Sequence, residues 1–214
     1  MTTRIRWLLG GVGCAVSLLV LSGCANSADA GANIGANGKI GVVASTDVWG
    51  SVVSAVGGND VQVSSLINSP SQDPHDYESN AADALEIGKA KLVISNGGGY
   101  DTFFAKAVSA AGNNPRSVVA FDLSGKSGRG AAEPNEHVFY DLPTVAKVAD
   151  TVAADLGEID PRHRDTFTAN ARRFQHGIER LRTRAARIGT THPGLEAVCT
   201  EPVADYLLRT AGIQ

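Results

Sequence analysis

Residues 40–44 read Ile-Gly-Val-Val-Ala, and Ser-Thr-Asp follows directly at 45–47. The apolar, β-branched run is typical of a buried strand, and the polar residues after it are typical of a helix N-cap. A pair of glycines at 57 and 58 would end that helix. The stretch therefore predicts a strand followed by a helix, which is the repeating unit of a parallel sheet.

The same pattern continues as far as residue 121. Strands are predicted at residues 61–66, 91–95 and 117–121, and helices at residues 80–89 and 101–111. Strands that alternate with helices indicate a parallel sheet covered on both faces, so we predict an α/β lobe over residues 39–158. With 43% hydrophobic and 19% charged residues, the composition is that of a globular protein rather than a disordered chain.

Periodicity also predicts which side of each helix faces the core. For the helix at residues 80–89, the expected inward face consists of Ala81, Ala84 and Leu85, with Ile87 at its edge. For the helix at residues 101–111, it consists of Phe103, Phe104, Ala107 and Val108. Three glycines at 97–99 stand before the second helix and admit two interpretations, a phosphate-binding loop or a tight turn. Neither Gly-x-Gly-x-x-Gly with a downstream acid nor Gly-Lys-Ser/Thr is present, which favours the turn.

Two more helices are predicted in the second half of the chain, one from Pro143 and a longer one over residues 161–188. Asp160 and Pro161 supply an N-cap and a first-turn proline. The helix that begins at Pro143 has an expected apolar face of Val145, Val148, Val152 and Leu156. The expected apolar face of the longer helix consists of Phe167, Ala171, Phe174, Ile178, Leu181, Ala185 and Ile188. At 1.5 Å per residue the longer helix spans roughly 40 Å, more than one lobe needs, so we expect residues 159–189 to link two lobes.

Beyond the long helix, a strand is predicted at residues 195–199 and a helix from Thr200, ending at Gly212. One strand and one helix do not make a domain. We therefore expect residues 190–214 to be the beginning of a second α/β lobe that is truncated in this sequence.

The N-terminal residues have the pattern of an export signal. Arg4 and Arg6 precede an apolar run over residues 7–21, and Leu-Ser-Gly-Cys ends at Cys24. The run is shorter than the about 20 apolar residues of a membrane span, so residues 1–23 are predicted to be a signal peptide and a permanent span is the weaker alternative. Leu-Ser-Gly-Cys resembles the lipobox of bacterial lipoproteins, which implies cleavage before Cys24 and a lipid on its sulfur.

Residues 24–38 are then expected to form a lipidated, flexible tether, because they are mostly Ala, Gly, Asn and Ser and have little apolar surface to bury. Removal of residues 1–23 would take away two arginines and no acid, which makes the chain more acidic than its formal net charge of −3. Such a chain has no basic stripe, and we expect it not to bind nucleic acid.

Several residues with reactive side chains are interpreted as structural. Cys199 has no cysteine partner once Cys14 and Cys24 are assigned to the export region, and a small buried hydrophobe is favoured over a reactive thiol. His163 and His176 lie among charged residues of the long helix, outside its apolar face, and are predicted to face solvent.

His75 and His137 occupy more informative positions. Residues 73–78 read Asp-Pro-His-Asp-Tyr-Glu and residues 135–141 read Asn-Glu-His-Val-Phe-Tyr-Asp, each in a loop at the carboxyl edge of the predicted sheet, where open α/β sheets bind ligands. Two neutral imidazoles converging there would suit a transition metal, and Glu201 could add a carboxylate. Taken singly, each histidine could equally be a hydrogen-bonded loop residue, and no compact zinc-binding motif is present.

These stretches, together with Leu-Val-Ile-Ser-Asn-Gly at 92–97, the long helix and Thr-Glu-Pro-Val-Ala-Asp-Tyr at 200–206, resemble the zinc/manganese solute-binding lipoproteins of bacterial ABC importers. The resemblance runs from about Lys39 to the end of the sequence. It implies two α/β lobes joined by one long helix, with metal ligands at His75, His137 and Glu201. Two features depart from the family: residues 124–135 lack the histidines of many zinc-specific members, and the usual fourth ligand would lie beyond residue 214.

The resemblance implies capture of Zn²⁺ or Mn²⁺ as cargo and its delivery to an ABC permease by a monomer anchored through Cys24 on the extracytoplasmic face of the membrane. No catalytic residue is assigned. Because the ligands must be deprotonated, the affinity for the metal should fall as the pH drops below the usual histidine pKa of about 6.5. Two alternatives stay open: a secreted metal-dependent hydrolase, since two histidines and a glutamate also form open catalytic zinc sites, and a remnant that binds no metal tightly.

Overall fold

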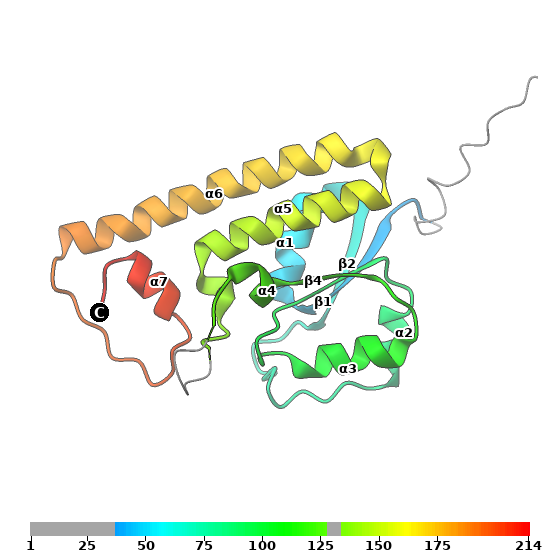
Figure 1. Ribbon diagram of the computed structural model, residues 1–214, viewed down its shortest axis with the longest axis horizontal. Helices are drawn as coiled ribbons and strands as arrows, with labels where there is room; N and C mark the ends of the chain where they lie inside the picture. The colour runs from blue at the N-terminus through cyan, green and yellow to red at the C-terminus, as the bar shows by residue number, and fades with distance from the viewer. Residues whose placement is uncertain (1–36, 128–133) are drawn as a thin grey trace, which may run out of the picture.

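The structure, a computed structural model, describes residues 37–127 and 134–214 and contains a four-stranded parallel sheet (Figure 1). Its strands are β1 (Ile40–Thr46), β2 (Val61–Ile67), β3 (Leu92–Ser95) and β4 (Arg116–Val119). The order across the sheet is β2-β1-β3-β4, and Val42 lies opposite Val63 on one side and Leu92 on the other. The predicted signal peptide, Cys24 and most of the predicted tether lie outside the described residues.

Helices cover both faces of the sheet, as the sequence predicts. They are α1 (Asp47–Gly57) and α5 (Leu142–Ile159) on one face and α2 (Ala81–Ile87) and α3 (Thr102–Ala111) on the other. Val42 of β1 belongs to the first core and Val43 to the second, because successive strand residues point to opposite faces. The strand order reverses between β1 and β3, which makes their carboxyl ends the expected ligand-binding edge.

The predicted apolar faces of α3 and α5 are confirmed, whereas that of α2 is wrong. The buried residues of α3 and α5 include Phe103, Phe104, Ala107, Val145, Val148, Val152 and Leu156. In α2, however, Leu85 is 63% exposed, and Asp83 and Ile87 are buried instead. The Asp83 carboxylate accepts hydrogen bonds from the Asn80 N–H at 2.8 Å and the Tyr77 hydroxyl at 3.1 Å. This capping box fixes the rotation of a seven-residue helix and leaves Leu85 on its outer side.

The glycines at 97–99 form the predicted tight turn. All three have positive φ, and a Cβ at Gly97 or Gly98 would overlap the Val119 or Phe121 side chain. The strand predicted at 117–121 ends earlier, at Val119, and Phe121 belongs to the short helix α4 (Ala120–Ser124). Two 3₁₀ turns, η1 (Gly58–Asp60) and η2 (Val138–Tyr140), complete this half of the described chain.

The long helix is confirmed as α6 (Arg164–Thr191), which follows the 3₁₀ turn η3 (Pro161–His163). Its 28 residues span roughly 42 Å. It packs along α5 and runs past the end of that helix towards α7 (Asp205–Thr210), as Figure 1 shows. Phe167 is fully buried, whereas Leu181 is 49% exposed and Ile188 43% exposed, so the apolar stripe is covered best near its N-terminal end.

The junction between α5 and α6 is built on the buried side chain of Asp160. Its carboxylate accepts from the Arg162 backbone N–H and guanidinium and lies 2.8 Å from Nδ1 of His163. Asp160 is therefore an N-cap, but of the 3₁₀ turn η3 rather than of the long helix itself, which begins at Arg164. His163 lies in η3 rather than in the long helix, and it contacts this carboxylate instead of facing only solvent. His176 is exposed, as predicted.

The C-terminal segment differs most from the prediction. Within the described residues, 195–199 form no strand, and their backbone bonds to the C-terminal end are those of the Ala197 N–H with the Gln214 carbonyl and of the Gln214 N–H with the Leu195 carbonyl. Two such bonds do not make a ladder, and none of the described strands pairs with this segment. The last helix begins at Asp205 rather than Thr200, and Cys199 is exposed rather than buried. None of the described helices combines the length and apolar character that a membrane crossing requires.

Candidate metal centre

His75 lies in the loop of residues 68–80 that follows β2. The Asp73 carboxylate accepts a hydrogen bond from the His75 N–H at 2.9 Å, and the Asp76 N–H donates to the Asp73 carbonyl at 3.3 Å. This tight turn presents the imidazole outward, where its side chain is 46% exposed. Its Nε2 lies 3.6 Å from Oε1 of Glu136, a residue adjacent to the second predicted ligand.

His137 lies at the start of η2 and is buried, with 8% of its surface exposed. Its Nδ1 is 2.8 Å from Oδ1 of Asn135, and the same oxygen accepts a hydrogen bond from the His137 backbone N–H at 3.0 Å. The ring of Phe139 lies edge-on to it with a centroid separation of 5.7 Å. His137 is therefore held more rigidly than His75, with one ring nitrogen already engaged.

Tyr100 lies between the two predicted ligands. Its ring centroid is 5.3 Å from that of His75 and 5.6 Å from that of His137, with both imidazoles in edge contact. Tyr100 follows the glycine turn after β3, so the sheet edge itself brings the three rings together. Burial raises the pKa of the Tyr100 hydroxyl, and the nearby carboxylates of Asp101, Asp73, Glu136 and Asp47 raise it further. The phenol therefore stays neutral at physiological pH.

Asn96, at the carboxyl end of β3, holds the backbone of the second ligand loop. It is fully buried, and its Nδ2 donates to the Glu136 carbonyl at 2.8 Å and to the Gly97 carbonyl at 2.9 Å. Its Oδ1 accepts from the indole N–H of Trp49 at 3.2 Å. One side-chain amide thus joins α1, the turn after β3 and the residue before His137.

The Asp101 carboxylate closes the turn from the other side. It accepts from the Asn96 N–H at 2.6 Å and from the Gly97 N–H at 2.8 Å, and the residue is almost fully buried. These backbone donors are consequently occupied by a protein carboxylate, which argues against a phosphate site at the glycine turn.

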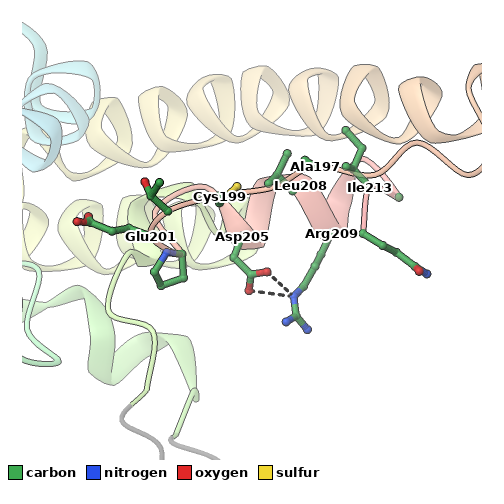
Figure 2. Close-up of a pocket in the computed structure, with 11 residues that line it drawn as sticks. Ala197, Cys199, Glu201, Asp205, Leu208, Arg209 and Ile213 are labelled. Carbon is green, nitrogen blue, oxygen red and sulfur yellow. Dashed lines mark hydrogen bonds and ion pairs between the residues drawn. The ribbon is translucent and has the colours of Figure 1, made fainter.

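Glu201 lies on an exposed segment ahead of α7. It lines a pocket of about 700 Å³ together with Cys199, Asp205 and Arg209, and Figure 2 shows its carboxylate directed away from α7 while Asp205 pairs with Arg209. The segment reaches the second ligand loop through Asn135, whose Nδ2 donates to the Pro202 carbonyl at 2.9 Å. Glu201 is therefore close in sequence to a contact with the His137 loop.

The structure brings His75, His137 and Glu136 around Tyr100, and it does not place Glu201 in that group. Among the described residues, no set of three or more His, Cys, Asp or Glu side chains is arranged to hold a metal ion. The ligand set His75, His137 and Glu201 stays a prediction. Sequence reasoning missed Tyr100, Asn96 and Asn135 as parts of the site, and the only available signal was their position beside the glycine turn and the second histidine.

The amino-acid sequence of this chain matches a known protein family over most of the length of the chain. Residues 42–214 match the family described as ZnuA, zinc-uptake complex component A, periplasmic. The chain belongs to the ZnuA family. The long helix, the parallel sheet and the histidine-bearing loops described above all fall within the matched residues.

Curated relatives of this ZnuA family chain include transport lipoproteins with different metals in their names. The manganese ABC transporter substrate-binding lipoprotein PsaA of Streptococcus mitis is 25% identical over 179 residues, which cover 78% of this chain and 56% of PsaA. The iron ABC transporter substrate-binding lipoprotein MtsA of Streptococcus pyogenes serotype M1 is 23% identical over 193 residues, which cover 85% of this chain and 59% of MtsA. The chain spans little more than half the length of these relatives.

Solved structures agree with the ZnuA family fold. A crystal structure of ZnuA superposes with a TM-score of 0.74 at 23% identity, covering 82% of this chain and 68% of that one. The periplasmic zinc-binding protein TroA from Treponema pallidum superposes with a TM-score of 0.71 at 22% identity, covering 83% of this chain and 66% of TroA. At these identities the likeness establishes the α/β fold and says nothing further about the ligand.

Proposed function

We propose that the chain is the substrate-binding component of a metal importer, which captures a divalent transition metal outside the cytoplasm and delivers it to an ABC permease. The observation that carries this proposal is the placement of His75 and His137 on either side of Tyr100, at the carboxyl edge of the sheet in a ZnuA family fold. The names of the relatives, which include manganese and iron transporter lipoproteins, support the same class of cargo.

In this proposal His75 and His137 are metal ligands, and Glu201, whose segment contacts the His137 loop through Asn135, supplies a carboxylate. Neutral imidazole and carboxylate suit zinc and manganese, the two cargo ions we favour. Capture and release make and break no covalent bond, so the chain needs no catalytic residue. The helix α6 would link the described lobe to further structure.

We also propose that the protein is held at the outer face of the membrane by a lipid on Cys24 and acts as a monomer. Support comes from the Leu-Ser-Gly-Cys sequence at 21–24 and from the word lipoprotein in the names of the relatives. The acidic composition expected after removal of the N-terminal arginines suits attraction of a cation rather than of nucleic acid.

The test is calorimetric titration of the full chain with zinc and with manganese. We expect binding at micromolar or lower concentration that is lost in His75→Ala and in His137→Ala. His176→Ala is the matched control, because His176 is exposed on α6 and belongs to no candidate ligand set. Binding that survives both ligand substitutions, or no binding to the unsubstituted chain, would overturn the proposal.

A further inference from the structure

Asn135 contacts both the candidate ligand His137 and the segment that carries Glu201. Its Oδ1 accepts from the His137 backbone N–H at 3.0 Å and lies 2.8 Å from His137 Nδ1. Its Nδ2 donates to the Pro202 carbonyl at 2.9 Å. Its own backbone carbonyl accepts from the Tyr206 hydroxyl at 2.7 Å. Every polar group of the side chain therefore has a partner, on two parts of the chain far apart in sequence.

These bonds determine which nitrogen of His137 carries the proton. A backbone N–H can only donate and a backbone carbonyl can only accept, so the Asn135 atom facing the His137 N–H must be oxygen and the atom facing the Pro202 carbonyl must be nitrogen. The amide oxygen can only accept, so Nδ1 of His137 must be the donor in the contact at 2.8 Å. In the neutral ring, Nε2 then holds the free lone pair that a metal requires.

The other side of Asn135 is a docking point for the C-terminal segment. Pro202 is bonded to the side chain and Tyr206 to the backbone, so the two bonds bracket the start of α7. Lys126 reinforces this contact, since its Nζ lies 4.3 Å from the centroid of the Tyr206 ring and 3.1 Å from the Asp141 carboxylate. Glu201 precedes Pro202 directly, so docking of this segment brings a candidate ligand towards the His137 loop.

We propose that Asn135 is a positioning residue that fixes His137 with Nε2 available to a metal and couples that arrangement to docking of the segment of residues 200–206. The inference rests on the proposed function for its metal-dependent part and on the hydrogen bonds alone for the rest. Because coupling between two events is reciprocal, metal bound at His137 strengthens docking of the segment, and docking strengthens metal binding. The C-terminal segment thereby responds to the occupancy of the metal site.

Three substitutions separate the two roles of Asn135. Asn135→Ala removes both side-chain bonds. Asn135→Asp keeps an oxygen acceptor for His137 Nδ1 and loses the donor to Pro202. Tyr206→Phe removes the hydroxyl bond to the Asn135 backbone and leaves the amide that faces His137 untouched. Asn113→Ala is the control for general destabilisation, because Asn113 bonds the carbonyls of Ile87 and Gly88 outside the site.

The first measurement is made on the metal-free full chain by ¹⁵N nuclear magnetic resonance, together with amide hydrogen exchange. We expect His137 to carry its proton on Nδ1 in the unsubstituted chain, in Asn135→Asp, in Tyr206→Phe and in Asn113→Ala, and to lose this preference in Asn135→Ala. Amide exchange in α7 should accelerate in all three substitutions that weaken docking and stay unchanged in Asn113→Ala. A proton on Nε2 in the unsubstituted chain would overturn the inference.

The second measurement adds zinc or manganese. Asn135→Ala should lower the affinity by roughly 10- to 100-fold, the usual effect of removing a hydrogen-bond partner from a metal-bound histidine. Asn135→Asp should restore only part of it, because the acceptor for His137 Nδ1 returns while docking of the segment stays weakened. Metal should slow exchange in α7 of the unsubstituted chain and not in Asn135→Ala. Metal binding with no change in α7 exchange would overturn the coupling. Absence of any metal binding would overturn the proposed function, and the metal-free spectra would still decide the role of Asn135.

Discussion

Replacement of Asn96 by alanine tests whether one buried amide holds the candidate site together. Asn96 is fully buried and makes three side-chain hydrogen bonds, to Trp49, Gly97 and Glu136. The indole N–H of Trp49, itself fully buried, would be left without its partner, which costs about 1–3 kcal/mol. The two bonds donated by Nδ2 contribute about 0.5–1.5 kcal/mol each.

The Glu136 carbonyl keeps a second donor, the Val138 N–H at 2.6 Å, so it is not left unpaired by the substitution. Contributions at one site do not add fully, and we therefore expect Asn96→Ala to lower the free energy of unfolding by about 2–4 kcal/mol. The assay is urea unfolding followed by circular dichroism, with the midpoint and slope compared between variants.

Asn113→Ala is again the matched control, because Asn113 is also an asparagine whose side chain donates to backbone carbonyls. It bonds those of Ile87 and Gly88, at 3.1 and 3.2 Å, on the other side of the sheet. It should cost stability without disturbing His137, whereas Asn96→Ala should also shift the ring resonances of His137 through the Glu136 backbone. A loss below about 1 kcal/mol in Asn96→Ala would show that the amide network does not support this edge of the sheet.

Four further substitutions test the packing of the long helix and the junction that precedes it. Phe167→Ala should cost about 3–5 kcal/mol of unfolding free energy because Phe167 is fully buried, whereas Leu181→Ala, at a side chain 49% exposed, should cost far less, by the same urea assay. Gly189→Ala should detach α7 from α6, since a Cβ there would overlap the carbonyl of the residue after α7; unchanged amide exchange in α7 would contradict this. The hydrogen bond from Arg162 lowers the pKa of Asp160 below its usual 3.8. The ionised carboxylate therefore stabilises the fold above that pH, and this contribution is lost as the pH falls through the lowered pKa. Asp160→Asn should reduce the fall in the urea midpoint at acid pH, and an unchanged pH profile of the midpoint would refute this.

Local periodicity was enough to predict most of the sheet and the long helices. The strand at residues 40–44 and the buried face of α5 follow from patterns that are complete within one segment. The face of α2 could not be predicted this way, because a capping box outside its apolar pattern sets the rotation of so short a helix. The strand expected at 195–199 failed for a related reason: a strand needs a neighbouring strand, and local sequence does not report whether one is present.

In the candidate site, too, some residues could be predicted from the sequence and others could not. His75 and His137 could be selected from sequence because loops after parallel strands converge on one edge. Asn96 and Asn135 could not, because a single asparagine is common in loops and their partners lie 40 and 67 residues away in the chain. The tautomer of His137, on which its proposed use as a ligand depends, follows from the local contacts with Asn135, whose amide orientation is also fixed by the distant contact with Pro202.

The distribution of hydrogen bonds also decides which acidic side chains are free to meet a cation. Asp101 accepts from two backbone N–H groups, and Asp141 caps α5 and pairs with Lys126, so both are already satisfied by the protein. Glu136 instead faces the Nε2 atom of His75 at 3.6 Å. At this distance the two groups are close enough for an electrostatic contact but not for a hydrogen bond. If His75 holds the proposed metal through Nε2, the ion takes the place that now faces Glu136, and Glu136→Gln would remove one negative charge beside the ion.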